Sequence, residues 1–333
     1  MKRRSWWSIA WVRFRSNKLA MFGVFLIGMY AAAAFVHPIL MATVWDRDTY
    51  HPIYGHDDVI VQKEVVLVVT DDDTQIQLMR ARMVNPFVEV GESVSEVTLP
   101  EPFTVEHPLG VDNLGRDVLS MVLAASTPSF VVGLSAAITT AVVGLLVATT
   151  AAYWRGPTDM ILTEVSDTLQ LLPAPLLMVI LGAGPFRDSL GPLAFGLIYG
   201  VVAGASGAAI VLRSQALSVL SRPFIDATRV AGAGAKQIIL RHLLPHLVPV
   251  AALYMLLGAS GAIVADGFVS FLGFSNTRLN WGTIIFFAMS LPPANRAGIP
   301  WEAIIAAAGA ISLFSAAFYL VGLGFRDIAR ATD

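Results

Sequence analysis

Long apolar stretches alternate with polar segments along the chain, and six of these stretches are long enough, or nearly so, to cross a bilayer. A helix needs about 20 mostly apolar residues to cross the hydrocarbon core. The six stretches are residues 19–40, 130–153, 160–181, 190–212, 247–264 and 303–323. A shorter run at residues 283–291 is too brief to span and is expected at the membrane interface. The pattern predicts an all-α polytopic membrane protein with six transmembrane helices.

The composition supports the membrane class. Of the 333 residues, 56% are hydrophobic and 14% are charged, and the mean hydropathy is +0.67. Soluble domains carry about 25% charged residues. The formal net charge of -2, without a basic stripe interleaved with aromatics, gives no indication of a nucleic-acid partner. The chain has no cysteine, which excludes disulfides, zinc–thiolate sites and thiol catalysis.

The basic residues predict how the chain threads, because Lys and Arg are retained on the cytoplasmic side. Several precede the first span, and with six spans both termini then lie in the cytoplasm. This arrangement places 14 of the 22 basic residues inside. A basic start before an apolar run is also typical of a signal peptide, but this apolar run is long for one. We expect residues 1–18 to be a cytoplasmic segment and residues 19–41 to be the first transmembrane helix.

A long segment between the first two spans, residues 42–117, holds 15 of the 24 acidic residues. Apolar and polar side chains alternate over residues 59–70 and 74–84, and residues 87–99 are a further candidate strand. The pattern predicts a small external β-rich insertion, followed by a five-helix core at residues 118–333. Either the insertion contacts another protein or it is a solvated cap.

The polar segment at residues 213–246, on the predicted cytoplasmic side, is too polar to span and too long for a simple connection. Pro223 suits the first turn of a helix, and Asp226 lies near the positive end of that helix. Gly232 and Gly234 would end the helix and allow a tight turn. A second short helix would follow. Two short helices joined at a glycine elbow are suited to docking into a groove on another protein.

This segment resembles the EAA loop of ABC-importer permeases, in which Glu-Ala-Ala is followed by three residues and Gly, and later by Leu-Pro. The corresponding residues here are Asp226-Ala227-Thr228, Gly232 and Leu244-Pro245. Further motifs are similar to those of the C-type subunit of dipeptide and oligopeptide permeases. They are RFRSNKLAMFGVFLIG (13–28), HPLGVDNLGRDVLS (107–120), DTLQLLPAPLLMVI (167–180), RHLLPH (241–246), DGFVSFLGF (266–274) with NWGT (280–283), and GLGFRD (322–327). The resemblance covers nearly all of the chain except about residues 45–100.

The resemblance implies a pathway shared between two homologous permease subunits, each bound to one ATPase, with an external solute-binding protein that delivers the solute. ATP and Mg would bind to the ATPases, so this chain would bind no cofactor or metal and would not be an enzyme. The implied solutes are dipeptides or oligopeptides, and related permeases carry nickel or oligosaccharides. The implied coupling element spans residues 224–244, where Asp226 and Thr228 depart from the family's pattern. Its candidate residues, with the Leu-Pro that follows, are Phe224, Asp226, Ala227, Thr228, Arg229, Gly232, Gly234, Arg241, Leu244 and Pro245.

Four residues in or near the spans are candidates for the pathway or for contact with the partner subunit: Asp167, Pro173, Pro175 and Asp266. A carboxylate at membrane depth is costly and faces protein or water. Asp167 and Asp266 therefore have either this role or a solvated position at the end of a span, and Glu164 is assigned to a span end. The two prolines free backbone carbonyls in mid-membrane, where they either line a cavity or produce a packing kink.

Other functions find less support in the sequence. The chain has no Gly-Lys dipeptide, hence no Walker A loop, so any ATP must be bound by another polypeptide. No G-x-S-x-G motif or Ser/His/Asp constellation is visible. His242 and His246 have the spacing of a helical metal site, but Pro245 lies between them and no metal is predicted. A secondary transporter or channel remains the alternative, although we find no inverted repeat or midplane ion-coupling residues.

Overall fold

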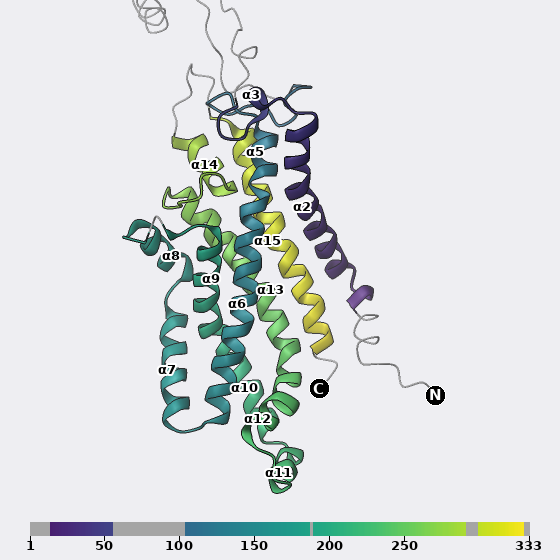
Figure 1. Cartoon of the computed structure of the whole chain (residues 1–333), viewed down its shortest axis with the longest axis vertical. Coiled ribbons are helices and arrows are strands. Elements are labelled where there is room, and N and C mark those ends of the chain that lie inside the picture. The colour runs from purple at the N-terminus through teal and green to yellow at the C-terminus, as the bar shows by residue number, and fades with distance from the viewer. Residues whose placement is uncertain (1–13, 56–103, 187–188, 291–298, 330–333) are drawn as a thin grey trace, which may run out of the picture.

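The computed structural model describes residues 14–55, 104–186, 189–290 and 299–329 of the chain, and these form a bundle of long helices (Figure 1). Five helical segments in this part are long and apolar enough to cross a membrane. The bent pair α7 and α8, taken together, passes the same test and brings the number of spans to six. The spanning elements are α2 (Lys18–Thr43), α5 and α6 (Val118–Ala124, Ser126–Tyr153), α7 and α8 (Pro157–Leu171, Ala174–Ala183), α9, η2 and α10 (Pro192–Ala203, Gly204–Ala208, Ala209–Leu220), α12, η3 and α13 (Ala235–Ile238, Ile239–Leu243, Leu244–Phe271), and α15 (Trp301–Ala329). Three shorter helices complete the described part: α3 (Arg47–Tyr50), α11 (Pro223–Val230) and α14 (Trp281–Ser290).

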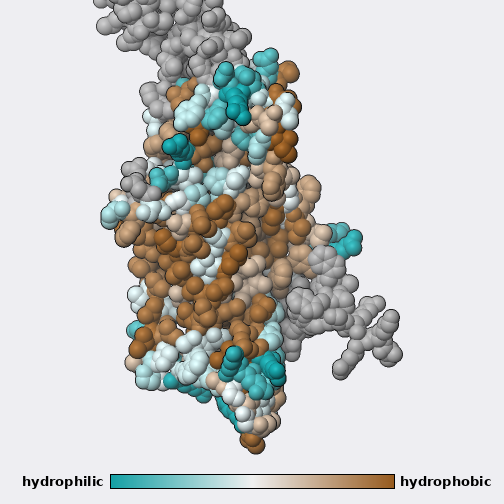
Figure 2. Space-filling view, viewed as in Figure 1, coloured by the Kyte–Doolittle hydropathy of each residue, from teal (hydrophilic) through white to brown (hydrophobic). Residues whose placement is uncertain are grey.

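The prediction of an all-α polytopic membrane protein is confirmed for the described residues. Figure 2 shows a hydrophobic belt between two more hydrophilic ends, as expected of a protein that spans a bilayer. We call these the α11 end and the α14 end, after the short helices found there (Figure 1). The first residues of α2 and the last residues of α15 both lie toward the α11 end.

The predicted strands at residues 59–70, 74–84 and 87–99 lie outside the described residues. Within the described part the only β pairing is an isolated bridge between Val111 and Asp117. The prediction of a β-rich insertion therefore finds no support here. The described flank of that segment contains a helical turn, α3, instead of a strand.

The third span, predicted as one helix at residues 160–181, is broken at Leu172 and Pro173. Its two halves, α7 and α8, meet at an angle of 80°. Leu172 adopts an extended conformation (φ -85°, ψ 120°), as expected for a residue before proline, because the proline ring disfavours the helical conformation there. The break is therefore larger than a kink within a continuous helix.

The predicted boundaries of the polar segment at residues 213–246 also need correction. Helix α10 continues to Leu220, and α12 runs through η3 into α13, so the second of the two predicted short helices is the start of a span. Pro245 does not end it. A π-helical turn, η3, precedes the proline, and such turns take up irregular backbone hydrogen bonding within a helix. Only α11 is a separate short helix.

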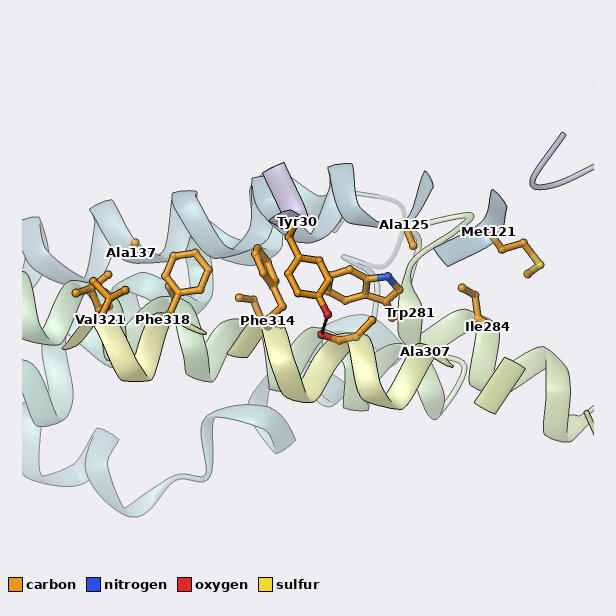
Figure 3. Packing of buried hydrophobic residues seen from close by; sticks show 14 of the residues in the cluster. Tyr30, Met121, Ala125, Ala137, Trp281, Ile284, Ala307, Phe314, Phe318 and Val321 are labelled. Carbon is orange, nitrogen blue, oxygen red and sulfur yellow. Dashed lines mark hydrogen bonds between the residues drawn. The ribbon is translucent and has the colours of Figure 1, made fainter. Parts of the chain in front are cut away.

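The core at the α14 end is aromatic. Tyr30 of α2, Trp281 of α14 and Phe314 of α15 contact one another with ring centroids 4.8–5.5 Å apart (Figure 3). The Tyr30 hydroxyl donates to the Ala310 carbonyl, and the Trp281 indole N–H donates to the Val122 carbonyl. These bonds satisfy the polar atoms of buried aromatic side chains. The run expected at the membrane interface, α14, is thereby fixed against α15 and α5.

Close packing of α9 and η2 against α6 depends on small residues. Gly200 and Gly204 lie four residues apart, and a Cβ at either would come within 2.8 Å of a backbone carbonyl of α6. Such contacts let two helices approach closely in a membrane.

Candidate functional site

Helix α11 and the turn after it form a compact elbow at the α11 end. Pro223 is at the first position of the helix and Asp226 lies in its first turn. Gly232 has φ 86°, and its N–H donates to the Arg229 carbonyl. A residue with a side chain is strained at this φ, which explains the glycine. Gly234 has φ -77° and precedes α12 in an ordinary extended conformation, so only the first glycine is required by the turn.

The elbow is held on the bundle by buried apolar side chains. Ile225 of α11 and Ile238 of α12 are buried in one cluster with Leu243 and with Leu212 of α10. The ring of Phe224 contacts His242 and His246, with centroids 6.1 and 6.2 Å away. These two histidines, whose spacing first suggested a metal site, thus lie against an aromatic ring. Burial of one face orients α11 rigidly on the ends of α10 and α13.

The opposite face of α11 is open to solvent. Val230 is 90% exposed, and Phe224 is 38% exposed. All ten predicted coupling residues, named above from Phe224 to Pro245, are exposed or half-buried. The elbow is therefore anchored on one face and exposes apolar side chains on the other.

The loop before α5 forms a buried polar cluster at the α14 end. Arg116 binds Asp112 with Nη2 2.5 Å from Oδ2, and the two side chains are 7% and 4% exposed. His107 Nδ1 lies 2.8 Å from Asp117 Oδ2. Asp117 also caps α5 by accepting from the Ser120 N–H. Arg116 lies over the ring of Phe287, which connects the loop to α14. The motif at residues 107–120 thus forms an internal structural network.

The four candidate pathway residues occupy different positions. Asp266 is 5% exposed and accepts a hydrogen bond from Asn280 Nδ2 at 3.0 Å, so of the two alternatives left open for it the solvated position is wrong. Asp167 is exposed on α7, and Pro173 is exposed at the break between α7 and α8. Pro175 lines an open cavity of about 340 Å³. The four residues therefore do not form one site.

This cavity lies between the broken span and the helices α6, α9, η2 and α13. Its polar lining residues, which the sequence analysis did not single out, are Thr140, Gln170, Tyr199, Ser206 and Tyr254. Each lies within a predicted span. The sequence signal that could have identified them is a polar side chain near the middle of an apolar stretch. Below the cavity, toward the α11 end, Arg213 of α10 donates from Nε and Nη2 to the two carboxylate oxygens of Asp159 of α7, at 2.5 and 2.6 Å. This ion pair connects the broken span to the helix that leads into α11.

The fold is that of a multi-pass, all-α membrane protein. Residues 140–328 match the family of binding-protein-dependent transport system inner membrane components, and residues 5–54 match the N-terminal transmembrane domain of oligopeptide transport permease C. The chain belongs to this family and is a membrane permease subunit of an ABC importer, of the dipeptide and oligopeptide C type. This result confirms the resemblance and removes the alternative of a secondary transporter.

The chain is similar to curated permeases over most of its length. It is 28% identical to the dipeptide transport system permease protein DppC of Bacillus subtilis over 324 residues, which cover 96% of this chain and 83% of the relative. It is 25% identical to the oligopeptide permease OppC of the same organism over 332 residues, or 98% and 90% of the two chains. A putative peptide transport system permease of Brucella suis is 30% identical over 231 residues, or 68% and 74%.

Proposed function

We propose that this permease forms half of the translocation pathway of an importer for dipeptides or oligopeptides. The other half is a second, homologous permease, and an external binding protein delivers the solute. Two ATPase subunits bind ATP and Mg, so hydrolysis takes place outside this chain. The names of the relatives, which include dipeptide, oligopeptide and glutathione permeases, support a peptide solute over nickel or an oligosaccharide.

The α11 end faces the cytoplasm in this proposal, and both termini are cytoplasmic. Basic residues support the orientation, since they are retained on the inner side of the membrane. They gather at the α11 end: Lys18, Arg155, Arg213, Arg222, Arg229, Lys236 and Arg241. The domain organisation follows, with the α2 span, an external segment at residues 42–117, and a permease core at residues 118–333.

The observation that carries the coupling role is the exposed apolar side chain of Val230 on an anchored elbow. Ile225 and Ile238 fix the elbow to α10 and α13, so a force applied to α11 reaches two spans directly. A groove on the ATPase that covers Val230 and Phe224 would transmit the closure of the ATPases to the pathway. The candidate coupling residues are the ten named above, and Val230 is added to them.

The test is purification of the complex from its native membrane in mild detergent, with the co-purifying proteins identified by mass spectrometry. We expect a second permease and ATPase subunits with the wild-type chain. Val230→Asp should reduce ATPase recovery more than tenfold, because a charge would be buried in the interface. Ser221→Asp, which adds the same charge at an exposed position before α11, should leave recovery within twofold.

Two results would contradict the proposal. If the wild-type chain purifies without any nucleotide-binding subunit, the proposal that it binds ATPase subunits is wrong. If ATPase recovery with Val230→Asp equals that of the wild-type chain, the elbow is not the surface on which the ATPase docks.

A further inference from the structure

The cavity of about 340 Å³ lies at mid-membrane depth, because each span that lines it contributes residues from near its middle. Thr140 is central in α6, and Gly258 is central in α13. Ser206 belongs to η2, between α9 and α10, and Leu172 lies at the break between α7 and α8. The volume is within the range of small-molecule sites, about 300–1,000 Å³.

Two of the spans around the cavity have irregular backbone beside it. The third span is bent by 80° between α7 and α8. The fourth contains the π-helical turn η2, in which Ser206 has non-helical angles of φ -96° and ψ -110°. Non-helical backbone at membrane depth is tolerated only where protein buries it or where it lines a water-filled cavity. The two irregular segments meet at the same cavity, which favours the second of these explanations.

The lining of the cavity combines apolar side chains with polar ones that carry no charge. None of the described residues that line it is Asp, Glu, Lys, Arg or His. Hydroxyl groups come from Thr140, Ser206 and the tyrosines 199 and 254, and a carboxamide comes from Gln170. Such groups donate and accept hydrogen bonds without bringing a charge into the membrane.

Thr140 provides an independent indication of a ligand. Its side chain is buried, and Oγ1 has no hydrogen-bond partner among the described residues. A buried polar atom without a hydrogen-bond partner destabilises the folded protein, unless water or a ligand forms a hydrogen bond with it. Glycines preserve the space around the polar groups: a Cβ at Gly207 would lie 3.0 Å from Gln170 Oε1, and one at Gly258 would run into Thr140.

We propose that this cavity is the solute-binding site contributed by this subunit, and that it recognises the uncharged amide groups of a peptide backbone. Thr140 and Gln170 hydrogen-bond the N–H and C=O groups that a peptide must otherwise leave unpaired at membrane depth. The charged termini of the peptide lie outside this cavity, since its lining offers no counter-charge. The assignment rests on the proposed function of a peptide importer and goes beyond it by naming the groups that are bound.

The experiment uses the complete importer in proteoliposomes, with its binding protein, and measures uptake of radiolabelled trialanine per ATP hydrolysed. Thr140→Val removes the hydroxyl at nearly constant volume, and Gln170→Met removes the carboxamide. Each should lower uptake per ATP about fivefold, because each removes one hydrogen bond to the solute. Thr140→Ser keeps the hydroxyl and should retain wild-type uptake.

Thr149→Val is the matched control on the same helix. Thr149 is also buried, but its hydroxyl donates to the Leu145 carbonyl at 2.6 Å, and it does not line the cavity. Uptake with Thr149→Val should stay within twofold of the wild-type rate. Gln170 is exposed, so Gln170→Met tests the site even where Thr140→Val prevents assembly.

The outcomes separate this assignment from the proposed function. A wild-type importer that takes up no trialanine would overturn the peptide solute itself. Wild-type uptake with unchanged rates in Thr140→Val and Gln170→Met would overturn only the cavity assignment. An equal loss with Thr140→Val, Thr140→Ser and Thr149→Val would show that packing of α6, and not the Thr140 hydroxyl, limits uptake.

Discussion

At the α14 end, the charged side chains of Asp112, Arg116 and Asp117 in the loop before α5 are buried and paired, whereas the charged side chains of α11 at the other end are exposed. Arg116 and Asp112 are 7% and 4% exposed, but Arg229 and Asp226 are 48% and 69% exposed. The first pair holds its own loop against α14. The second leaves its end of the molecule ready for contact with another protein.

The comparison shows that a family motif in the sequence need not lie on the surface that contacts another protein. The motif at residues 107–120 is one of those that carry the family resemblance, yet its charged side chains are paired within the chain. The α11 segment departs from the family's pattern at Asp226 and Thr228, yet it presents the exposed surface. Mutations at the two ends should therefore affect different properties: folding at one and complex formation at the other.

The largest effect is expected from Arg116→Met. This change leaves the Asp112 carboxylate buried without its cation, which costs about 3–5 kcal/mol of stability. We expect a strong fall in the yield of folded protein and in the temperature of unfolding, measured in detergent by size-exclusion chromatography after heating. Arg278→Met, at an exposed arginine of the same end, is the control and should change neither. If Arg116→Met unfolds at the wild-type temperature, the buried pair in this loop does not stabilise the fold.

A smaller effect is expected from Gly232→Ala at the α11 end. Both Gly232 and Gly234 have open space where a Cβ would stand, but only Gly232 has a positive φ. Alanine at position 232 should cost about 1–2 kcal/mol in local strain and shift the elbow away from its docking conformation. ATPase recovery in the pull-down should fall about 5–30-fold.

Gly234→Ala is the matched control for this strain, because its φ of -77° suits any residue. Its ATPase recovery should remain within twofold of the wild-type value. Equal losses for the two alanine variants would show that side-chain volume at the elbow is responsible, and not the backbone conformation of Gly232.

Local signals in the sequence predicted most of the fold. Six apolar stretches became five continuous spans and one bent pair, and Pro173 marks the position of the bend. The glycine elbow was predicted because a positive φ after a short helix favours glycine. The helix through Pro245 was missed, since the π-helical turn before it leaves no clear signal in the sequence.

The cavity could not be predicted, because its lining comes from spans far apart in the sequence. Thr140, Gln170 and Tyr254 are each an ordinary polar residue within an apolar stretch. Only tertiary packing brings them together and leaves the Thr140 hydroxyl without a hydrogen-bond partner in the described part of the chain. The two alternatives for Asp266 were left open for the same reason, since its contact with Asn280 depends on how the segment before α14 folds back on α13.

The smallest effect is expected from Asp226→Asn. The ion pair between Asp226 and Arg229 spans 3.2 Å on an exposed helix face, where such pairs contribute about 0–0.5 kcal/mol. The temperature of unfolding should therefore not change measurably. In the complex, Asp226 lies beside the proposed docking surface, where a charge at the rim mainly affects the dependence of binding on salt. We expect ATPase recovery to fall about twofold at low salt and to equal the wild-type value at high salt, where exposed charges are screened. A clear loss of thermal stability in Asp226→Asn would mean that charges at the α11 end also hold the fold, and the contrast between the two ends would fail.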